Sequence, residues 1–224
     1  MAGKPRLLDL FCGAGGAAMG YSRAGFEVVG VDIEPQPNYP FEFIQCDVME
    51  FPLHAAIFTR DIDAIHASPP CQSYSRAMRH LAFPQPMLLD ETRELLESTG
   101  LPYVIENVIG SPLPHSDDLF GRFGTTLCGT MFGMRIYRHR LFETSFPVVA
   151  DSCNHSQPAM NPHNVKGREL IYAEFGKQNP DPIWEREMGI DWMDRYEARE
   201  AIPPAYTEFI GQQLLENLGV NHGR

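Results

Sequence analysis

The sequence has no long apolar run and no closely spaced pair of cysteines. No stretch reaches the roughly 18 apolar residues that a membrane-spanning helix needs, and the opening residues lead into strand-like Leu7–Leu10 without the apolar core of a secretory leader. The five cysteines stand far apart, without a Cys-x-x-Cys pair, which argues against a disulfide scaffold and against a zinc ribbon. We therefore expect an intracellular, cytoplasmic protein with no membrane partner.

Positive charge is also scarce, because 18 basic residues face 29 acidic ones and the net charge is −11. This balance argues against a protein that coats nucleic acid. Its distribution is uneven, however, since no acidic residue occurs between Ala64 and Leu89 or between Arg122 and Arg140. Arginines occur in both stretches, so the sequence predicts two basic islands on an otherwise acidic surface.

The first third of the chain alternates short apolar runs with helix-like stretches, glycine or proline marks the joints, and further strand candidates follow. The predicted strands are Leu7–Phe11, Phe26–Val31, Phe43–Cys46, Ala64–Ala67, Tyr103–Glu106 and Leu141–Thr144. The predicted helices between and after them are Ala17–Ala24, Met87–Ser98 and Tyr206–Leu218. Strands separated by helices predict an α/β protein with a mostly parallel sheet covered by helices on both faces.

The amino-acid composition changes after about Pro147. The stretch 151–167 is rich in Asn, His, Ser and Pro, and 178–182 is a second turn-rich patch. Order returns with one or two short helices expected within Trp184–Glu200. This part of the chain is therefore predicted to be dominated by loops.

A glycine-rich turn, Asp9–Gly16, lies between the first predicted strand and the first helix. Glycines let a ligand approach the backbone, and a helix N-terminus offers free N–H groups to an anion. Asp32 and Asp47 then end the next two strands, where an acid can meet a ribose diol. Together they favour an adenosine-containing cofactor, although each taken alone is also typical of a tight turn or a loop cap.

The segment Ser68-Pro-Pro-Cys71 follows a buried strand directly. Two prolines restrict the backbone before the thiol, and Arg76 and Arg79 nearby favour the nucleophilic thiolate. The alternative is an inert small side chain in a turn, which is the commoner role of a cysteine.

Glu106 ends another buried-looking strand, where apolar surroundings can raise a carboxyl pKa and make it a proton donor. Arg138 and Arg140 supply positive charge near the same sheet edge. A loop cap and a solvated basic face are the ordinary alternatives.

The ordered set of these motifs resembles the DNA cytosine-5 methyltransferase family. It comprises Asp9–Gly16, Asp32, Asp47, Pro70-Cys71-Gln72, Glu106-Asn107-Val108 and Arg138-x-Arg140, with a similar closing segment at 202–211. The resemblance implies a Rossmann-like fold of S-adenosylmethionine-dependent methyltransferases. It also implies a catalytic domain made of residues 1–146 and 201–224 and a small, loop-rich target-recognition segment at 147–200.

The resemblance implies a mechanism in which the Cys71 thiolate adds to C6 of cytosine and activates C5 toward methylation. Glu106 matches the acid at the N3 edge, and Arg138 and Arg140 match arginines that hold the base and its backbone. The products are 5-methylcytosine and S-adenosylhomocysteine. Because a stacked base cannot be reached, the target cytosine in double-stranded DNA is expected to flip out.

The resemblance also assigns binding residues. The positions that match the S-adenosylmethionine site are Phe11, Gly13, Gly15, Gly16, Asp32, Asp47 and Pro70. Residues of the loop at 72–86 are expected to contact DNA, and they are Gln72, Ser75, Arg76, Arg79 and His80.

The chain departs from the family in three places. Ile136 stands where Gln is usual, and Gly211-Gln212-Gln213 replaces Gly-Asn followed by a small residue. The recognition segment is also short, which implies a reduced site or recognition supplied by a protein partner or a second copy. In that region His139, His155, His163 and Cys153 have a spacing that fits no standard metal site, so no metal is predicted.

Two alternatives remain open at this level. The same chemistry on RNA or on a free cytosine nucleotide fits the net charge of −11. A regulatory module that binds cofactor or DNA without turnover is the other, although the intact Cys71 and Glu106 argue against it. A role in restriction–modification, as protection against a nuclease, is one expectation for an active enzyme.

Overall fold

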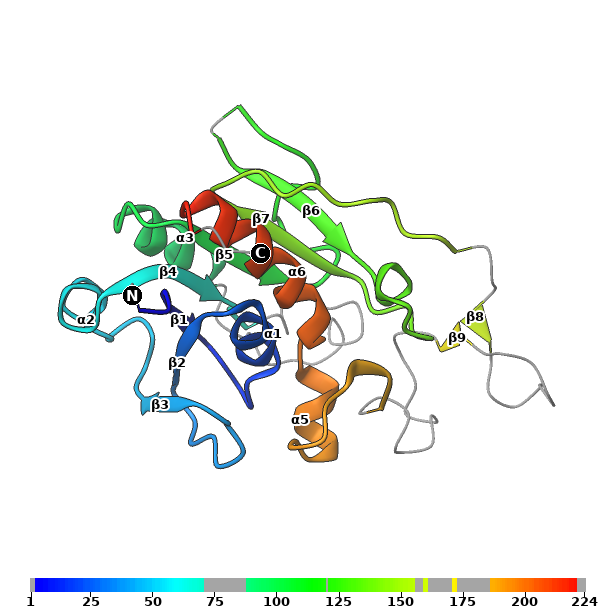
Figure 1. Ribbon diagram of the computed structural model, residues 1–224, viewed down its shortest axis with the longest axis horizontal. Coiled ribbons are helices and arrows are strands. Elements are labelled where there is room, and N and C mark those ends of the chain that lie inside the picture. Colours follow the sequence, from blue (N-terminus) through cyan, green and yellow to red (C-terminus); the bar gives the residue numbers. More distant parts are fainter. Residues whose placement is uncertain are drawn as a thin grey trace, which may run out of the picture.

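The computed structural model describes residues 3–70, 88–119, 121–155, 159–160, 171–172 and 186–220. Its centre is a seven-stranded sheet in the order β3-β2-β1-β4-β5-β7-β6 (Figure 1). The strands are β1 (Arg6–Leu10), β2 (Glu27–Asp32), β3 (Glu42–Gln45), β4 (Ile62–Ala67), β5 (Tyr103–Asn107), β6 (Phe123–Leu127) and β7 (Arg140–Thr144). Neighbours from β3 to β5 pair in parallel, whereas β7 is antiparallel to both β5 and β6. The predicted mostly parallel sheet is confirmed.

Helices lie on either side of this sheet. They are α1 (Gly16–Ala24), α2 (Leu53–Arg60), α3 (Leu89–Glu97), α5 (Arg195–Glu200) and α6 (Pro204–Asn217), with the 3-10 turn η1 (Gly129–Phe132). The short strands β8 (Ala159–Met160) and β9 (Ile171–Tyr172) form a separate parallel pair. In the part of the chain that the structure describes, none of the helices has the length and apolar character to cross a bilayer.

Side chains of alternate residues along the strands point to opposite faces of the sheet and form two apolar layers. Leu7 of β1 belongs to the layer that α1 and α6 cover, which also includes Tyr21 and Leu214. Leu8, the next residue, belongs to the opposite layer, where Leu53 of α2 and Leu96 of α3 pack. Helices therefore cover both faces, which confirms the predicted α/β class.

The closing helix α6 packs directly on α1, as Figure 1 shows for the orange and blue helices at the centre of the view. A Cβ at Gly20 would overlap the carbonyl oxygen of Pro204 and the hydroxyl of Thr207. The Thr207 hydroxyl donates to the Ala17 carbonyl at 2.9 Å. This close approach fixes the last described helix against the helix that follows the glycine-rich turn.

The sequence placed most elements within two residues of their observed bounds. The helix expected at Met87–Ser98 spans Leu89–Glu97, and the one expected at Tyr206–Leu218 spans Pro204–Asn217. The sequence missed α2 and β6. β6 reads Phe-Gly-Thr-Thr-Leu and is half-buried at the edge of the sheet, so it lacks the apolar run that revealed the central strands.

Candidate active site

The glycine-rich turn after β1 contains three residues with left-handed backbone angles, Phe11 (φ 56°), Gly13 (φ 48°) and Gly15 (φ 87°). The Gly13 N–H donates to Oδ2 of Asp32 at 2.9 Å, so the end of β2 holds the turn in place. A Cβ at Gly15 would lie 3.0 Å from Tyr39, whereas one at Gly13 would meet no atom within 4 Å. The backbone at Gly13 therefore borders open space that a ligand can enter.

Asp32 ends β2, and Asp47 lies two residues beyond the end of the neighbouring parallel strand β3. The Cys46 N–H donates to the Asp32 carbonyl at 2.9 Å. Asp32 also accepts from the Glu34 N–H at 3.0 Å, and Asp47 accepts from the Met49 N–H at 2.9 Å. Both carboxylates thus cap turns at the sheet edge that carries the glycine turn. Contact with a ribose or an adenine ring stays a prediction.

Glu106, on β5, forms the most enclosed charged contact of this edge. Its side chain is only 7% exposed, and Oε1 lies 2.9 Å from Nε of Arg140, the first residue of β7. Burial raises the pKa of Glu106, while the positive charges of Arg140 and Arg138 oppose that rise. A carboxyl of raised pKa can hold or donate a proton near neutral pH.

A chain of hydrogen bonds also connects Glu106 to helix α1. The Tyr21 hydroxyl lies 3.0 Å from Nδ1 of His66, and Nε2 of His66 lies 2.8 Å from Oγ of Ser68. Ser68 in turn hydrogen-bonds the Glu106 side chain. Burial lowers the pKa of His66 to about 3, so its ring is neutral.

When Glu106 is ionised, the donor and acceptor roles along this chain of hydrogen bonds are fixed. The Ser68 hydroxyl donates to the carboxylate and accepts from Nε2–H of His66, which leaves Nδ1 to accept from the Tyr21 hydroxyl. Helix α1 is thereby connected to the acid. The sequence alone does not mark Tyr21, His66 or Ser68 as site residues, because a single buried histidine belongs to no motif.

The residues just before the predicted nucleophile are fixed by β5. The Asn107 amide donates to the carbonyl of Pro69 at 3.0 Å. Pro70 is half-buried beside it and is the last described residue before a gap. The predicted nucleophile and the predicted DNA contacts lie outside the described residues; they are Cys71, Gln72, Ser75, Arg76, Arg79 and His80.

The two predicted arginines make different contacts. Arg140 pairs with Glu106, whereas the buried guanidinium of Arg138 donates to the carbonyls of Arg199 (2.7 Å) and Ala201 (2.6 and 3.1 Å). Arg138 therefore ties the start of β7 to the entry of α6. Direct contact of Arg138 with a base stays a prediction.

Residues from the segment predicted for recognition pack on the glycine turn. Ala14 belongs to a small apolar cluster with Met188 and Ile190, and Nε1 of Trp192 donates to the Ala14 carbonyl at 2.9 Å. The Asn38 amide donates to the Glu197 carboxylate at 2.9 and 3.1 Å. Residues 186–201 thus support the predicted cofactor turn, a role that no motif in the sequence indicates.

Comparison with known proteins supports the resemblance. Residues 5–110 match the family model described as C-5 cytosine-specific DNA methylase. The chain is 34% identical over 122 residues to the type II methyltransferase M.XorII of Xanthomonas oryzae, covering 48% of this chain and 29% of that protein. It is 30% identical over 123 residues to M.AquIA of Picosynechococcus, covering 47% of this chain and 49% of that protein. The chain thus covers less than half the length of these two curated relatives.

Solved structures share the fold at lower identity. A putative DNA modification methyltransferase encoded within an E. coli prophage superimposes with a TM-score of 0.64 at 14% identity, covering 96% of this chain and 100% of that one. The Entamoeba histolytica methyltransferase EhMeth gives the same TM-score and identity, covering 97% of this chain and 99% of that one. The fold is therefore that of methyltransferases, and the family model reaches from the glycine turn past Glu106 but ends before Arg138.

Proposed function

We propose that this chain transfers a methyl group from S-adenosylmethionine to C5 of cytosine in DNA, because residues 5–110 match the C-5 cytosine-specific DNA methylase family model. The observation that carries the proposal is the buried Glu106–Arg140 pair beside the strand end that leads into Cys71. A carboxyl of raised pKa thus hydrogen-bonds Ser68, three residues before the predicted nucleophile, which supports the proposal.

The residues of the glycine turn fit the cofactor. The backbone at Gly13 faces open space, and Asp32 is already oriented by the N–H groups of Gly13 and Glu34. Phe11, Gly15 and Gly16 would hold the methionine part, Asp32 the ribose and Asp47 the adenine, and Pro70 would complete the cofactor site before the nucleophile. When bound, S-adenosylmethionine supplies an electrophilic methyl group.

The residues of the chain activate the base. The Cys71 thiolate forms a bond to C6 of cytosine, and Glu106 holds a proton at N3, so that electron density moves toward C5. Arg140 fixes the Glu106 carboxyl, and Arg138 holds the backbone that carries Arg140. After methyl transfer the C5 proton leaves to a base, the C6–S bond breaks, and Cys71 returns as a thiolate beside 5-methylcytosine.

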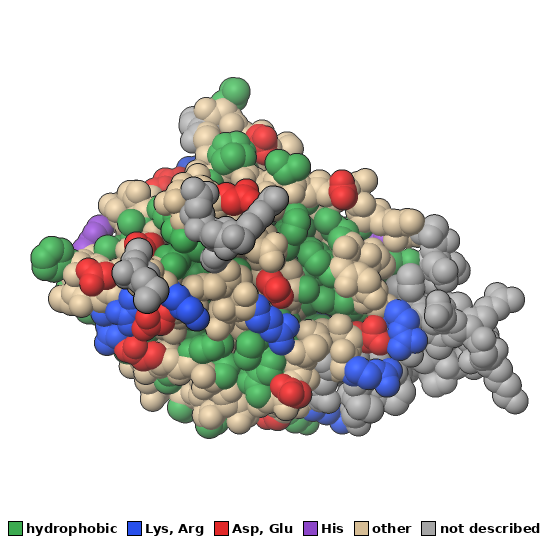
Figure 2. Space-filling view, viewed as in Figure 1, with side chains coloured by type: hydrophobic (Ala, Val, Ile, Leu, Met, Phe, Trp, Pro, Cys, Tyr) green, Lys and Arg blue, Asp and Glu red, His purple; other side chains and the backbone are tan. Residues whose placement is uncertain are grey.

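The substrate is proposed to be double-stranded DNA with the target cytosine flipped out. Residues 147–200 form a reduced recognition segment, and a protein partner or a second copy completes recognition. The net charge of −11 does not exclude this substrate, because acidic and basic side chains are interspersed on the face seen in Figure 2. The names of the curated relatives favour a role in restriction–modification.

The test compares the wild-type chain with Cys71→Ala on unmethylated plasmid and labelled S-adenosylmethionine. We expect the wild type to label cytosine C5 and the variant to bind the cofactor without transferring label. DNA that contains 5-fluorocytosine should trap only the wild type as a denaturant-resistant adduct. Equal labelling by both proteins would overturn the covalent route.

Parallel assays with transfer RNA and dCMP as acceptors distinguish DNA from the other cytosine substrates. Glu106→Gln tests the acid, with an expected loss of about 10²–10⁴-fold in turnover at unchanged cofactor affinity. If neither acceptor nor DNA is labelled while the cofactor binds, the chain is a binding module and the proposed enzyme is wrong.

A further inference from the structure

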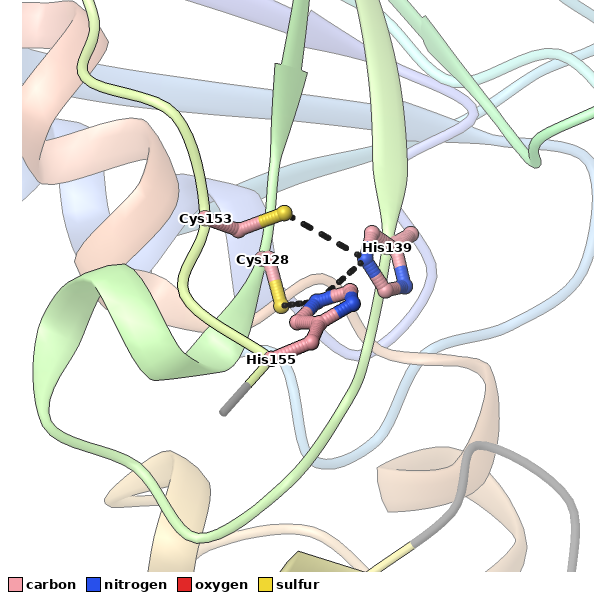
Figure 3. Close-up of side chains that lie close together, drawn as sticks. All are labelled: Cys128, His139, Cys153 and His155. Atoms are coloured by element: carbon pink, nitrogen blue, oxygen red, sulfur yellow. Dashed lines mark hydrogen bonds between the residues drawn. The ribbon is translucent and has the colours of Figure 1, made fainter. Parts of the chain in front are cut away.

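Four metal-binding side chains meet outside the candidate active site. Cys128 follows β6, His139 precedes β7, and Cys153 and His155 lie in the segment after β7. One ligand atom of each lies within 4.8 Å of the corresponding atom in every other. Figure 3 shows the four side chains pointing toward a common centre from three separate segments.

The separations match those of a tetrahedral zinc site. Zn–S bonds of about 2.3 Å and Zn–N bonds of about 2.0–2.1 Å place neighbouring ligands about 3.3 Å (N to N) and about 3.5 Å (N to S) apart. Here Nε2 of His139 lies 3.1 Å from Nε2 of His155. Sγ of Cys128 lies 3.5 Å from Nε2 of His155, and Sγ of Cys153 lies 3.8 Å from Nε2 of His139.

Hydrogen bonding alone is a weak reason for such a cluster. Thiols are poor donors and acceptors, and two imidazole nitrogens that face each other require one ring to lack its proton there. Three chain segments would lose conformational freedom to make these weak contacts. A divalent ion would satisfy all four ligand atoms at once, and the Thr130 hydroxyl, 3.3 Å from Sγ of Cys128, would support the sulfur from outside.

We propose that Cys128, His139, Cys153 and His155 bind one structural Zn²⁺. Two sulfur and two nitrogen ligands suit zinc, and four protein ligands leave no open position for a substrate or for activated water. Binding releases the two thiol protons, so that Zn²⁺ and two Cys–SH groups give a neutral bis-thiolate centre and two protons. The proposal departs from the sequence-based prediction of no metal.

The spacing explains why the sequence did not predict the site. The ligands follow the pattern Cys-x10-His-x13-Cys-x-His, which lacks the paired spacing of common zinc motifs. The candidate ligands named from the sequence include His163, which lies outside the described residues, but not Cys128. Only the antiparallel pairing of β6 with β7 brings Cys128 next to His139.

At this position the ion would stabilise the connection between β7 and the segments around it. His139 stands between Arg138, which holds the entry to α6, and Arg140, which pairs with Glu106. The ion would fasten the ends of β6 and β7 to the segment that continues toward residue 156. The inference stands on these four side chains and does not depend on the proposed catalytic activity.

The first experiment measures metal content. The full chain is purified without an affinity tag under reducing conditions and analysed by inductively coupled plasma mass spectrometry. We expect about one zinc per chain in the wild type and almost none in Cys128→Ser and Cys153→Ser. Cys46→Ser and His54→Gln, which change a cysteine and a histidine outside the cluster, should retain the metal.

The second experiment uses cobalt as a spectroscopic probe, because a ligand variant can fail to fold. His155 is exposed, so His155→Gln should keep the wild-type circular dichroism spectrum while it loses metal affinity. The reduced, metal-free wild type should give the visible bands of tetrahedral Co²⁺ and thiolate-to-cobalt charge transfer, and Zn²⁺ should displace both. His155→Gln should weaken the cobalt affinity at least tenfold.

Either of two results would overturn the proposal. One is a reduced wild-type chain that binds zinc no better than Cys128→Ser and gives no tetrahedral cobalt spectrum. The other is a native chain whose intact mass and thiol count show a Cys128–Cys153 disulfide in place of two thiolates.

Discussion

The parallel part of the sheet and the antiparallel β6–β7 pair are held together in different ways. Every residue of β1 from Leu7 to Leu10 is buried, and the ion pairs of this strand are made by Arg6, at its amino end. In β6, only Leu127 is buried. Next to it, β7 carries the buried Glu143, and the Cys–His cluster lies at its start. Apolar burial thus holds one region, whereas the other depends on specific polar contacts.

This difference has an energetic consequence. Apolar contacts contribute to the free energy of unfolding in proportion to the area removed from water. The loss of one such contact therefore removes only a small part of the total. A buried charge depends on one or two partners, and removal of one partner leaves the other uncompensated. We therefore expect the largest effects where β7 connects to the parallel part through an ion pair.

The largest effect is expected at Glu143, whose side chain is fully buried and which accepts from Nε and Nη2 of Arg93 at 2.9 Å each. Glu143→Gln should lower the free energy of unfolding by about 3–5 kcal/mol, because Arg93 loses its buried counter-charge. Asp90→Asn is the matched control. Asp90 binds the same arginine but is 80% exposed, so we expect less than about 1 kcal/mol.

Urea unfolding followed by circular dichroism measures both variants. Similar losses for Glu143→Gln and Asp90→Asn would contradict the view that burial decides the strength of this pair.

The next effect is expected at the α1–α6 contact of the parallel part. Gly20→Ala places a methyl group against the backbone of α6 and should cost about 3 kcal/mol through overpacking. Gly133→Ala provides the comparison near β6. A Cβ there meets no atom, so only the left-handed φ of 71° opposes it, at about 1–2 kcal/mol.

Thermal unfolding of the two alanine variants tests the comparison. If Gly133→Ala lowers the melting temperature as much as Gly20→Ala does, close packing of α6 on α1 is not what distinguishes the parallel part.

The sequence predicted the parallel part well for the same physical reason. Runs such as Leu7–Leu10 and Val28–Val31 are buried on both faces of the sheet, so their apolar character is visible without knowledge of their partners. β6 contains Gly124 and two threonines and gains its partners only through pairing with β7. A local pattern cannot reveal a strand whose stability comes from a distant neighbour.

The candidate site likewise contains residues that the sequence predicts and residues that only the structure reveals. Glu106 and Asp32 end predicted strands, so chain order alone brought them to one edge of the sheet. His66 and Ser68 act through contacts with Tyr21, which is 45 residues from His66 in the chain. Side-chain partners over such separations depend on the register of β1 with β4, which the sequence does not state.

A pH-dependent effect is expected from His66 in the parallel part. Its pKa is lowered from 6.5 to about 3 by burial, so the folded protein keeps the ring neutral while the unfolded chain takes up a proton near pH 6.5. The contribution of the neutral ring to the free energy of unfolding is fully present above pH 6.5 and is lost as the pH falls toward 3, by about 1.4 kcal/mol per pH unit. His66→Gln should remove this slope.

Urea unfolding at several pH values between 4 and 8 measures the slope. His54→Gln, at an exposed position on α2, should keep the wild-type slope. A parallel pH dependence in wild type and His66→Gln would show that His66 is not the group responsible.

The smallest effect is expected where residues 186–201 meet the glycine turn. Trp192→Phe keeps most of the ring but removes the donor to the Ala14 carbonyl, which should cost about 1 kcal/mol of stability. Because that carbonyl belongs to the turn predicted to hold the cofactor, affinity for S-adenosylmethionine should fall by about two- to fivefold in calorimetric titration. Tyr196→Phe, at an exposed position of α5, is the control and should change neither value. An unchanged affinity in Trp192→Phe would mean that Gly13 and Asp32 hold the turn without help from this segment.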